Sequence, residues 1–288
     1  MRFESGDDST TNVEDRRGSG GGGGMKLGLG GILLVGILSI VFRRNFFALL
    51  DQGSEGGGDR GAAPTSAPDD ADPRRAREAP LKQVAVRSFN DAQRFFATAA
   101  GAKTAYREAT LVLFWDRTRS GCGAAGSEMG PFYCPADTKV YIDLAFFDEL
   151  ARRFKAPGDF AQAYVMAHEM GHHAQNVLGV EGKMRREQRA DPGRKNDLSV
   201  RLELQADCFA GAWASSARTR GLLDPGDLEE GLAAAAAIGD DKIQKMSGRD
   251  VRPESFTHGS SAMRVRWFRR GFDTGKLDAC ETFSATSL

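Results

Sequence analysis

The stretch FAQAYVMAHEMGHHAQN, residues 160–176, contains the motif from which the rest of the chain can be interpreted. Residues 164–167 are helix-forming and largely apolar, which favours a helix that packs against a core. His168 and His172 are four residues apart, so a helix places both imidazoles on one face, where they can bind one ion. Glu169 follows His168 directly and can reach a water molecule bound to that ion. The stretch therefore predicts a metal site on a buried helix.

Zinc suits this pattern because it takes two neutral imidazoles, a third protein ligand and one open position for water. The ion lowers the pKa of that water to about 7, and a nearby carboxylate can take its proton as it attacks a carbonyl. The alternative is a surface helix with solvated histidines. Gly171 argues against this alternative, since a glycine costs up to about 1 kcal/mol inside a helix and indicates a close approach by another group. His173 lies off the metal face and is expected to support the site or to lie at the surface.

A third zinc ligand is needed, and residues 199–217, SVRLELQADCFAGAWASSA, predict a second helix that can supply it. Glu203 and Asp207 are four residues apart on one face of that helix. We expect Glu203 to complete the zinc ligands and Asp207 to accept the second ring N–H of a zinc-bound histidine. The alternative is a pair of solvated carboxylates. The second helix is predicted to be largely buried, where a carboxylate needs a partner or a metal, because its neighbouring residues are apolar: Leu202, Ala206, Phe209, Ala210 and Trp213.

Several longer motifs resemble one known family. They are spread over nearly the whole chain: NVEDRRG (12–18), the glycine run that follows, GPFYCPAD (130–137), AHEMGHHAQN, ELQADCFAG and FTHGSS. They resemble the bacterial putative neutral zinc metallopeptidase family and, more distantly, the gluzincins, which include the CAAX prenyl protease group. The resemblance implies a zincin-like fold, with His168, His172 and Glu203 as zinc ligands and Glu169 as general base. It implies no particular substrate.

His258, in the motif FTHGSS, is the one histidine outside the first zinc helix. It resembles the histidine that opens the last motif of CAAX-protease-like enzymes, which implies a catalytic role as donor to the oxyanion of the tetrahedral intermediate. A capping or core histidine is an equal alternative. Arg264 lies in a basic helix predicted over residues 263–272 and could serve the same role or bind a substrate carboxylate, although a structural arginine is the favoured alternative.

The composition limits the classes of function. The chain has 288 residues, a formal net charge of zero and 41% hydrophobic residues, which fits a globular protein of one or two domains. It has no basic run with interleaved aromatic residues, so we expect no nucleic-acid partner. The glycine run at residues 20–24 is not a phosphate-binding loop, because no strand precedes it and no G-K-[ST] follows it.

The N-terminal part divides by composition into three segments. Residues 1–24 are polar and then glycine-rich, which predicts a disordered tail. Residues 25–44 contain the uncharged run LGLGGILLVGILSIVF and predict a single transmembrane helix, since a crossing needs roughly 17 to 20 apolar residues. A buried core helix and a cleavable signal peptide are the alternatives; the long acidic start disfavours the second. Residues 45–82 are rich in Gly, Ala, Pro and charge and predict a flexible linker. Lys and Arg flank both ends of the apolar run, so they do not fix its orientation.

Residues 83–288 predict one zinc metallopeptidase domain of α+β class, mostly helical with a small β-sheet. Four elements are expected before the first zinc helix: a helix over 88–102, strands over 110–115 and 139–143, and a helix over 144–154. We expect residues 130–143 to form the wall of the cleft, where a substrate backbone pairs with an edge strand. An ordinary hairpin is the alternative.

Residues 179–197 are polar and charged and predict a connection between the two zinc-bearing helices that shapes one lip of the cleft. A further helix is predicted over residues 228–238 after the turn at 224–227, and Asp240 is expected to cap the next turn.

The chain has four cysteines and no C-x-x-C motif, so we expect no second zinc site of the finger type. An even number favours disulfides. Cys122 and Cys134 bracket one loop and form the natural first pair, which leaves Cys208 and Cys280 for the second. Disulfides persist in oxidising compartments, so these pairs predict a domain outside the cytoplasm. Four reduced, buried cysteines in a cytoplasmic domain are the alternative.

These patterns together predict a membrane-anchored, single-pass zinc metallopeptidase that hydrolyses peptide bonds of a protein or peptide substrate in the periplasm or at the cell surface. The alternative from another class is a metal-stabilised envelope scaffold or assembly factor with little proteolysis. Glu169 argues against the scaffold, because a structural zinc site is normally closed by four protein ligands. A hydrolase of non-peptide amides shares the same sequence pattern, and the oligomeric state is not set by it.

Overall fold

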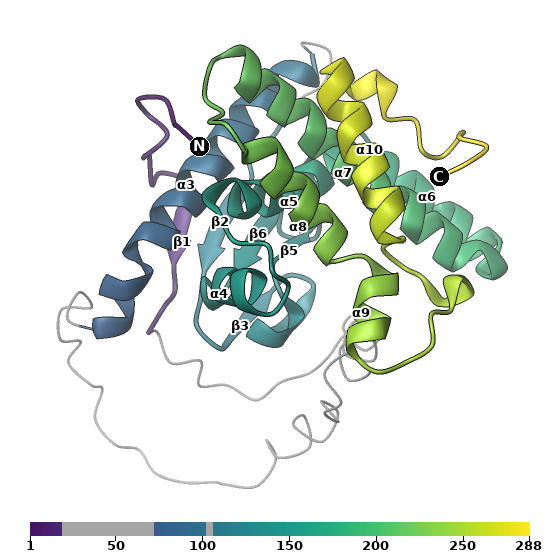
Figure 1. Cartoon of the computed structure of the whole chain (residues 1–288), viewed down its shortest axis with the longest axis horizontal. Coiled ribbons are helices and arrows are strands. Elements are labelled where there is room, and N and C mark those ends of the chain that lie inside the picture. The colour runs from purple at the N-terminus through teal and green to yellow at the C-terminus, as the bar shows by residue number, and fades with distance from the viewer. Residues whose placement is uncertain (19–71, 102–105) are drawn as a thin grey trace, which may run out of the picture.

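A computed structural model describes residues 1–18, 72–101 and 106–288 (Figure 1). It has the α+β architecture that the sequence predicts, with a helical majority and a small sheet. The predicted anchor at 25–44, the end of the predicted tail at 19–24 and most of the predicted linker, 45–71, lie outside the described residues. Among the residues that are described, no helix is both long enough and apolar enough to cross a bilayer.

The main sheet has four short strands in the order β1-β2-β6-β5. The first three strands are parallel, and β5 pairs antiparallel with β6, so β5 is an edge strand. A separate two-stranded hairpin is formed by β3 and β4. The strands are β1 Val13–Asp15, β2 Thr110–Leu113, β3 Arg117–Ser120, β4 Gly123–Gly126, β5 Phe132–Cys134 and β6 Lys139–Ile142.

The helices cover the sheet and carry most of the core (Figure 1). In the described part of the chain the α-helices are α3 Pro73–Ala99, α4 Ala145–Arg152, α5 Asp159–Val177, α6 Val180–Ala190, α7 Lys195–Thr219, α8 Asp227–Ala237, α9 Asp240–Met246 and α10 Ser261–Thr274. Short 3₁₀ turns follow at η2 Ser127–Met129, η3 Pro192–Arg194, η4 Pro253–Ser255 and η5 Leu277–Ala279.

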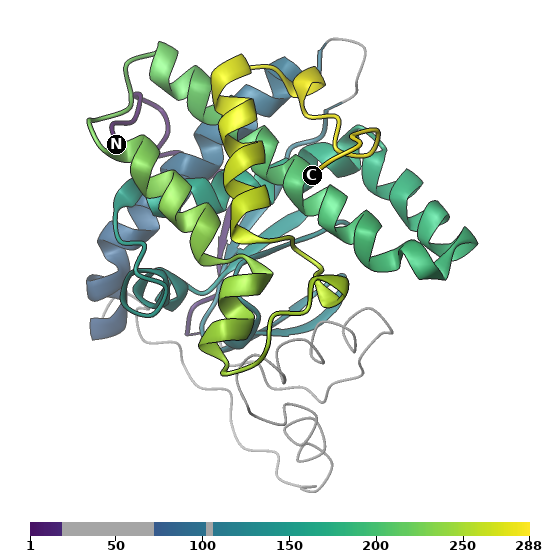
Figure 2. The ribbon, with the colours of Figure 1, turned by 45° about the vertical axis from the view of Figure 1, so that its right-hand side comes forward.

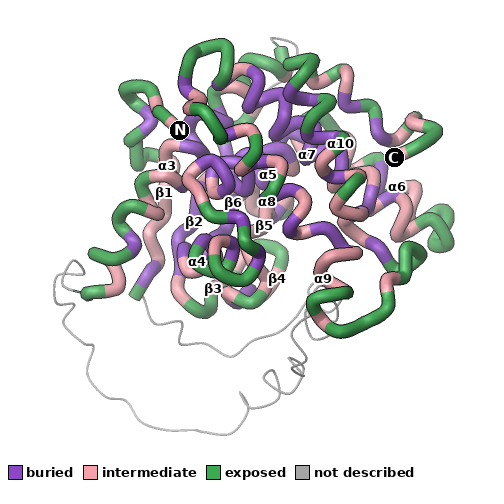
Figure 3. The backbone as a smooth tube through the Cα atoms, viewed as in Figure 1, coloured by how far each residue is buried: buried purple, intermediate pink, exposed green. Residues whose placement is uncertain are grey.

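The helix α5 runs through the middle of the molecule and contacts α3, α7 and α8. Most of its side chains are buried, and the buried backbone in Figure 3 is concentrated on α5, α7 and the sheet. At Gly171 an added Cβ would lie 3.1 Å from the carbonyl oxygen of Ala206 on α7. Gly171 therefore allows the close approach that the sequence indicates, and that approach brings together the two helices that are predicted to carry the zinc ligands.

A second close crossing joins α7 to α10, which lie side by side with the sheet behind them (Figure 2). A Cβ at Gly271 would lie 1.8 Å from the carbonyl oxygen of Cys208, and one at Gly211 would lie 2.0 Å from that of Phe268. Only glycine fits at these positions, since real Cβ atoms do not approach backbone so closely. The crossing fixes α7, and with it the side chains of Glu203 and Asp207.

Both expected cysteine pairs form disulfides. Cys122 joins Cys134 at the end of β5, with 5.8 Å between the Cα atoms, and Cys208 on α7 joins Cys280, with 5.6 Å. The first bond ties the β3–β4 hairpin to the edge strand. The second ties the C-terminal segment to the helix that carries Glu203.

The prediction of a disordered tail is wrong for residues 1–18, which are part of the fold. Strand β1 pairs with β2, and the Arg16 N–H donates to the Leu113 carbonyl at 2.7 Å. Arg17 is buried and bonds Glu78 of α3 at 2.9 Å. Although burial raises the pKa of the Asp15 carboxyl, Arg17 and Lys82 hold that pKa far below its usual value. Partners more than sixty residues away stabilise this segment, so its local composition gives no sign of them.

The domain also begins earlier than the predicted residue 83, because α3 starts at Pro73 within the predicted linker. Asp72 caps the helix by accepting from the Arg74 N–H, and Pro73 occupies the first turn, where proline is tolerated. Arg74 then reaches Glu78 at 2.8 Å and Asp143 at 3.1 Å. These ion pairs explain why a segment rich in proline and charge is helical.

The polar segment between the zinc-bearing helices also differs from the predicted connection, since most of it forms α6. Only Glu181 and Met184 of this helix are buried, so it has almost no apolar face that would reveal it in the sequence. The glycine-rich loop after β2 likewise contains the β3–β4 hairpin.

Candidate metal centre

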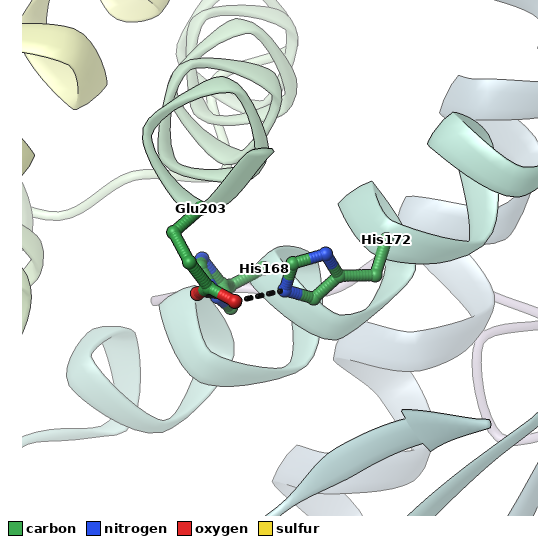
Figure 4. Close-up of side chains that lie close together, drawn as sticks. All are labelled: His168, His172 and Glu203. Carbon is green, nitrogen blue, oxygen red and sulfur yellow. Dashed lines mark ion pairs between the residues drawn. The ribbon is translucent and has the colours of Figure 1, made fainter. Parts of the chain in front are cut away.

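Three predicted ligands converge at the crossing of α5 and α7 (Figure 4). One carboxylate oxygen of Glu203 lies 3.3 Å from His168 Nε2, and the other lies 3.6 Å from His172 Nε2. The two imidazole rings are 4.8 Å apart between centroids and nearly perpendicular. Helical spacing places the histidines on one face of α5, and the close approach at Gly171 brings Glu203 to them.

These separations fit a tetrahedral zinc ion. Ligand atoms about 2.0 to 2.1 Å from such an ion lie about 3.3 Å from one another. The donor set of two imidazole nitrogens and one carboxylate is also typical of catalytic zinc, which keeps a fourth position for water. The residues present therefore fit a zinc ion at this point.

Asp207 holds the first histidine, as the sequence predicts. Its Oδ1 lies 3.0 Å from His168 Nδ1, and Tyr164 donates its hydroxyl proton to the same oxygen. Arg264 donates to both carboxylate oxygens, at 2.8 and 2.9 Å. Asp207 and Arg264 are almost completely buried, so each satisfies the charge of the other. With Nδ1 of His168 donating to Asp207, Nε2 faces Glu203.

Arg264 is therefore placed as a structural residue. Its side chain is 2% exposed and also reaches the Tyr164 hydroxyl at 3.2 Å and the Ile238 carbonyl at 3.3 Å. The interpretation in which Arg264 binds a substrate carboxylate does not fit, because its guanidinium is already occupied by Asp207.

Gln175 holds the second histidine, a role that the sequence alone does not predict. Its Oε1 lies 2.9 Å from His172 Nδ1, and its amide nitrogen donates to the Leu202 carbonyl at 2.7 Å and to Gln205 Oε1 at 3.1 Å. The spacing His172-x-x-Gln175 on one helical face is the signal that could have revealed it. Because Gln175 also bonds α7, it couples the orientation of His172 to the neighbouring helix.

The charges of this site depend on one another. Burial lowers the pKa of His172, but the Glu203 carboxylate outweighs burial and raises that pKa to about 10 in the metal-free protein. Burial raises the pKa of Glu203, yet His172 and His258 bring it well below its usual value. The metal-free centre thus has a cationic imidazole and an anionic carboxylate, and an incoming cation has to displace a proton.

Glu169 has the environment of a general base. It is buried, and burial raises the pKa of its carboxyl, while His172 and His168 lower it in part. The backbone of Tyr133, on the edge strand β5, also lowers this pKa and so favours the charged form of the carboxylate. Glu169 therefore lies between the metal-binding face of α5 and the edge strand.

His258 lies close enough to Glu203 for their charges to interact. Its Nδ1 is 3.0 Å from the Thr257 hydroxyl and 3.3 Å from Asp240 Oδ1, and the side chain is 36% exposed. Asp240 accepts the backbone N–H groups of Thr257, His258 and Gly259, so it shapes this loop rather than capping α9. The side chain of His258 is thus held at Nδ1 on the open side of the site.

A second group of carboxylates, Asp159, Asp227 and Glu230, lies at the start of α5 and α8. The amino group of Met1 lies 2.9 Å from Asp159 and 3.4 Å from Asp227. An ammonium group therefore balances this cluster, which we do not interpret as a metal site.

The chain is similar to proteins whose activity is not characterised. A family model described as "Putative neutral zinc metallopeptidase" matches residues 1–283. The uncharacterized protein YpfJ of Escherichia coli strain K12 is 56% identical over 179 residues, which are 62% of this chain and 62% of that protein. The uncharacterized protein Rv2575 of Mycobacterium tuberculosis strain H37Rv is 45% identical over 194 residues, 64% of this chain and 65% of that protein. The match thus spans less than two thirds of either relative. No solved structure matches the chain.

Proposed function

Because this chain belongs to the putative neutral zinc metallopeptidase family, we propose that it is a zinc-dependent peptidase with His168, His172 and Glu203 as ligands. The observation that carries this proposal is the convergence of these three side chains beside a buried carboxylate that is not one of them. A purely structural zinc site would be closed by a fourth protein ligand. Glu169 is not one of the three residues that converge as ligands, so its carboxylate is available for proton transfer.

In this proposal different residues transfer the proton, stabilise the oxyanion and orient the metal ligands. Bound zinc supplies a Lewis acid and lowers the pKa of water to about 7. Glu169 takes the proton of the attacking water and later passes it to the leaving amine. Although burial lowers the pKa of His258, Glu203 and Asp240 raise it and so favour the doubly protonated ring. That ring is held at Nδ1 by Asp240 and Thr257 and donates its Nε2–H to the carbonyl oxygen as negative charge develops there. Asp207 and Gln175 keep the two ligand imidazoles in the tautomer that exposes Nε2.

The peptide substrate is proposed to add to the sheet at β5. This strand is at the end of the order β1-β2-β6-β5, so one of its edges has no strand partner among the described residues. An extended peptide can pair with such an edge through backbone hydrogen bonds. Hydrogen bonds of Tyr133 with His173 and Asn176 of α5, the helix that carries Glu169, support this placement of the strand near the proposed general base.

We also propose that the domain acts outside the cytoplasm, attached to a membrane through residues 25–44. The two disulfides support an oxidising compartment. The apolar composition of residues 27–42 supports the attachment.

The test is the substitution Glu169→Gln, with Glu149→Gln on the exposed face of α4 as the matched control. We expect Glu169→Gln to retain one zinc per chain and to lose at least about 100-fold in cleavage rate, since general-base catalysis contributes typically 10²- to 10⁴-fold. The control should match the wild type. Cleavage is followed by mass spectrometry of a peptide library, with and without a chelator.

Two results would contradict the proposal. Cleavage by Glu169→Gln at the wild-type rate would exclude this mechanism. No chelator-sensitive cleavage by the wild type, together with a large fall in melting temperature on zinc removal, would favour the envelope scaffold instead.

A further inference from the structure

The helix α5 has two functional stripes, of which the metal centre uses one. His168, His172 and Gln175 face α7 and form the metal-binding stripe. Glu169, His173 and Asn176 are each one position further along the helix, and the last two hydrogen-bond the hydroxyl of Tyr133 on the edge strand β5. One rigid helix therefore presents the metal ligands on one side and holds the edge strand on the other.

We propose that His173 is a positioning residue, which acts through the hydroxyl of Tyr133 to fix the edge strand β5 relative to the metal centre and Glu169. This inference rests on the proposed peptidase function, because the distance that it fixes matters for a peptide paired with β5. Both ring nitrogens of His173 have partners outside the metal centre, namely Tyr133 and Arg107, so the residue acts through Tyr133.

The hydrogen bonds around His173 determine its tautomer. Nε2 lies 2.7 Å from the backbone carbonyl of Arg107, which can only accept, so Nε2 carries the proton. Nδ1 must then accept, and the hydroxyl of Tyr133, 3.1 Å away, donates to it. The hydroxyl oxygen in turn accepts from the Asn176 amide at 2.9 Å. Each group has the partner that its chemistry requires, and His173 is completely buried.

The Tyr133 hydroxyl is the polar link from this strand to α5. The ring of Tyr133 also packs edge-on against His173, with centroids 5.3 Å apart. The next residue, Cys134, is bonded to Cys122, so the strand is fixed at neighbouring positions to a helix and to a hairpin. Without the hydroxyl, His173 and Asn176 lose their shared partner, and the strand is free to shift away from α5.

The test combines one removal of the hydroxyl with two changes at His173. Tyr133→Phe should lower kcat/KM by about 10- to 100-fold for peptides long enough to pair with β5, since a misplacement of about 1 Å has effects of this size. His173→Gln keeps a donor for the Arg107 carbonyl but has no acceptor at the position of Nδ1, and should behave like Tyr133→Phe. His173→Asn keeps that acceptor and should recover most of the activity. The double variant Tyr133→Phe/His173→Gln should be no worse than either single variant, because both break the same bond.

Tyr106→Phe is the matched control. The ring of Tyr106 also lies edge-on to His173, at 5.2 Å, but its buried hydroxyl has no hydrogen-bond partner within the described part of the chain. Removing that hydroxyl should leave kcat/KM within twofold of the wild type. Zinc content should remain one per chain in every variant, because none of these changes touches a ligand.

A second readout does not depend on catalysis. Hydrogen exchange of the Tyr133 and Cys134 amides should be faster in Tyr133→Phe and His173→Gln than in the wild type or in Tyr106→Phe. If the wild type cleaves and Tyr133→Phe matches Tyr106→Phe in both kcat/KM and exchange, the positioning role is wrong. If the wild type cleaves no peptide, the proposed function fails. Faster amide exchange in Tyr133→Phe than in Tyr106→Phe would still support the positioning of β5 by His173.

Discussion

At the scale of single residues, the three histidines of α5 differ in the hydrogen-bond partner of Nδ1. His168 donates to a carboxylate, His172 to an amide oxygen, and His173 accepts from a tyrosine hydroxyl. The first two arrangements free Nε2 for a metal, and the third uses both nitrogens within the protein. The partner at Nδ1, rather than the motif alone, thus distinguishes a ligand from its neighbour in the chain.

The raised pKa of His172 gives a prediction about zinc binding. Since the Glu203 carboxylate raises that pKa to about 10, the imidazole is protonated at pH 7 in the metal-free protein. Zinc binding should therefore release at least one proton at pH 7 and weaken by about tenfold for each unit of falling pH. Calorimetry in buffers with different ionisation enthalpies measures this number. Zinc affinity that is constant between pH 6 and 8 would show that the imidazole is neutral.

The same pKa predicts how the metal-free fold responds to pH. A histidine whose pKa rises on folding stabilises the fold fully below its ordinary value of 6.5. That contribution is lost as the pH rises toward about 10. Metal-free protein should therefore lose melting temperature across this range, whereas zinc-loaded protein, with its imidazoles already neutral, should not show this loss.

The residues that converge at the candidate metal centre could be predicted from the sequence because the spacing within each helix is local. His168 and His172 share a helical face, and so do Glu203 and Asp207. The sequence gives no role to Gln175 and the wrong one, a helix cap, to Asp240. Their actual roles depend on partners from another element: the Leu202 carbonyl on α7 and the loop at residues 257–259. A carboxylate or amide in a polar sequence has no local feature that separates such a role from simple solvation.

At the scale of elements, the site depends on two helix crossings that glycines allow. Gly171 brings α5 to α7, and Gly271 brings α7 to α10. The second crossing matters for the metal centre because α10 carries Arg264 and α7 carries Asp207, whose ion pair orients His168.

A matched pair of glycine substitutions tests the second crossing. Gly271→Ala places a Cβ 1.8 Å from a backbone oxygen, so the helices must separate, at a cost of at least about 1 to 3 kcal/mol. Gly182→Ala lies in the first turn of α6 with only the end of Arg186 nearby, at 3.6 Å, and should stabilise the protein by up to about 1 kcal/mol. Denaturant unfolding compares the two. Equal effects of the same sign would show that the crossing is loose.

The predicted bounds agree closely with the observed ones for helices that have an apolar face, but helices that lack such a face were not predicted. The first zinc helix was predicted over residues 160–176 and spans Asp159–Val177. The helix α6 and the first turns of α3 were missed, since Arg74, Glu78 and their neighbours are stabilised by ion pairs with distant residues rather than by a hydrophobic stripe.

At the scale of the whole molecule, residues 1–18 complete the domain from the other end of the chain. Lys82 lies 3.0 Å from Asp15, and Lys139 forms an ion pair with Glu14. The family match begins at residue 1 and so includes this segment.

Chemical coupling of amines directly to carboxylates, carried out on the full chain, tests this arrangement. We expect mass spectrometry to recover peptides in which Lys82 is joined to Asp15 and Lys139 to Glu14, because amide formation requires direct contact. Lys82→Arg keeps the ion pair but supplies no amine that couples, so only the first product should disappear. Absence of both products from the wild type would mean that β1 is not paired in the native protein.

The pairing of β1 has a consequence for how the polypeptide can be threaded through a bilayer. Arg17 and Glu78 are in contact, so residues 17 and 78 lie in the same aqueous phase. A polypeptide segment whose two ends lie on the same side of a bilayer crosses that bilayer an even number of times, or not at all. A single crossing by residues 25–44, as the sequence predicts, would put the two partners of this buried ion pair in different phases and leave β2 with an open edge. The ion pair instead favours a membrane attachment that keeps residues 1–18 and 73–288 in one phase.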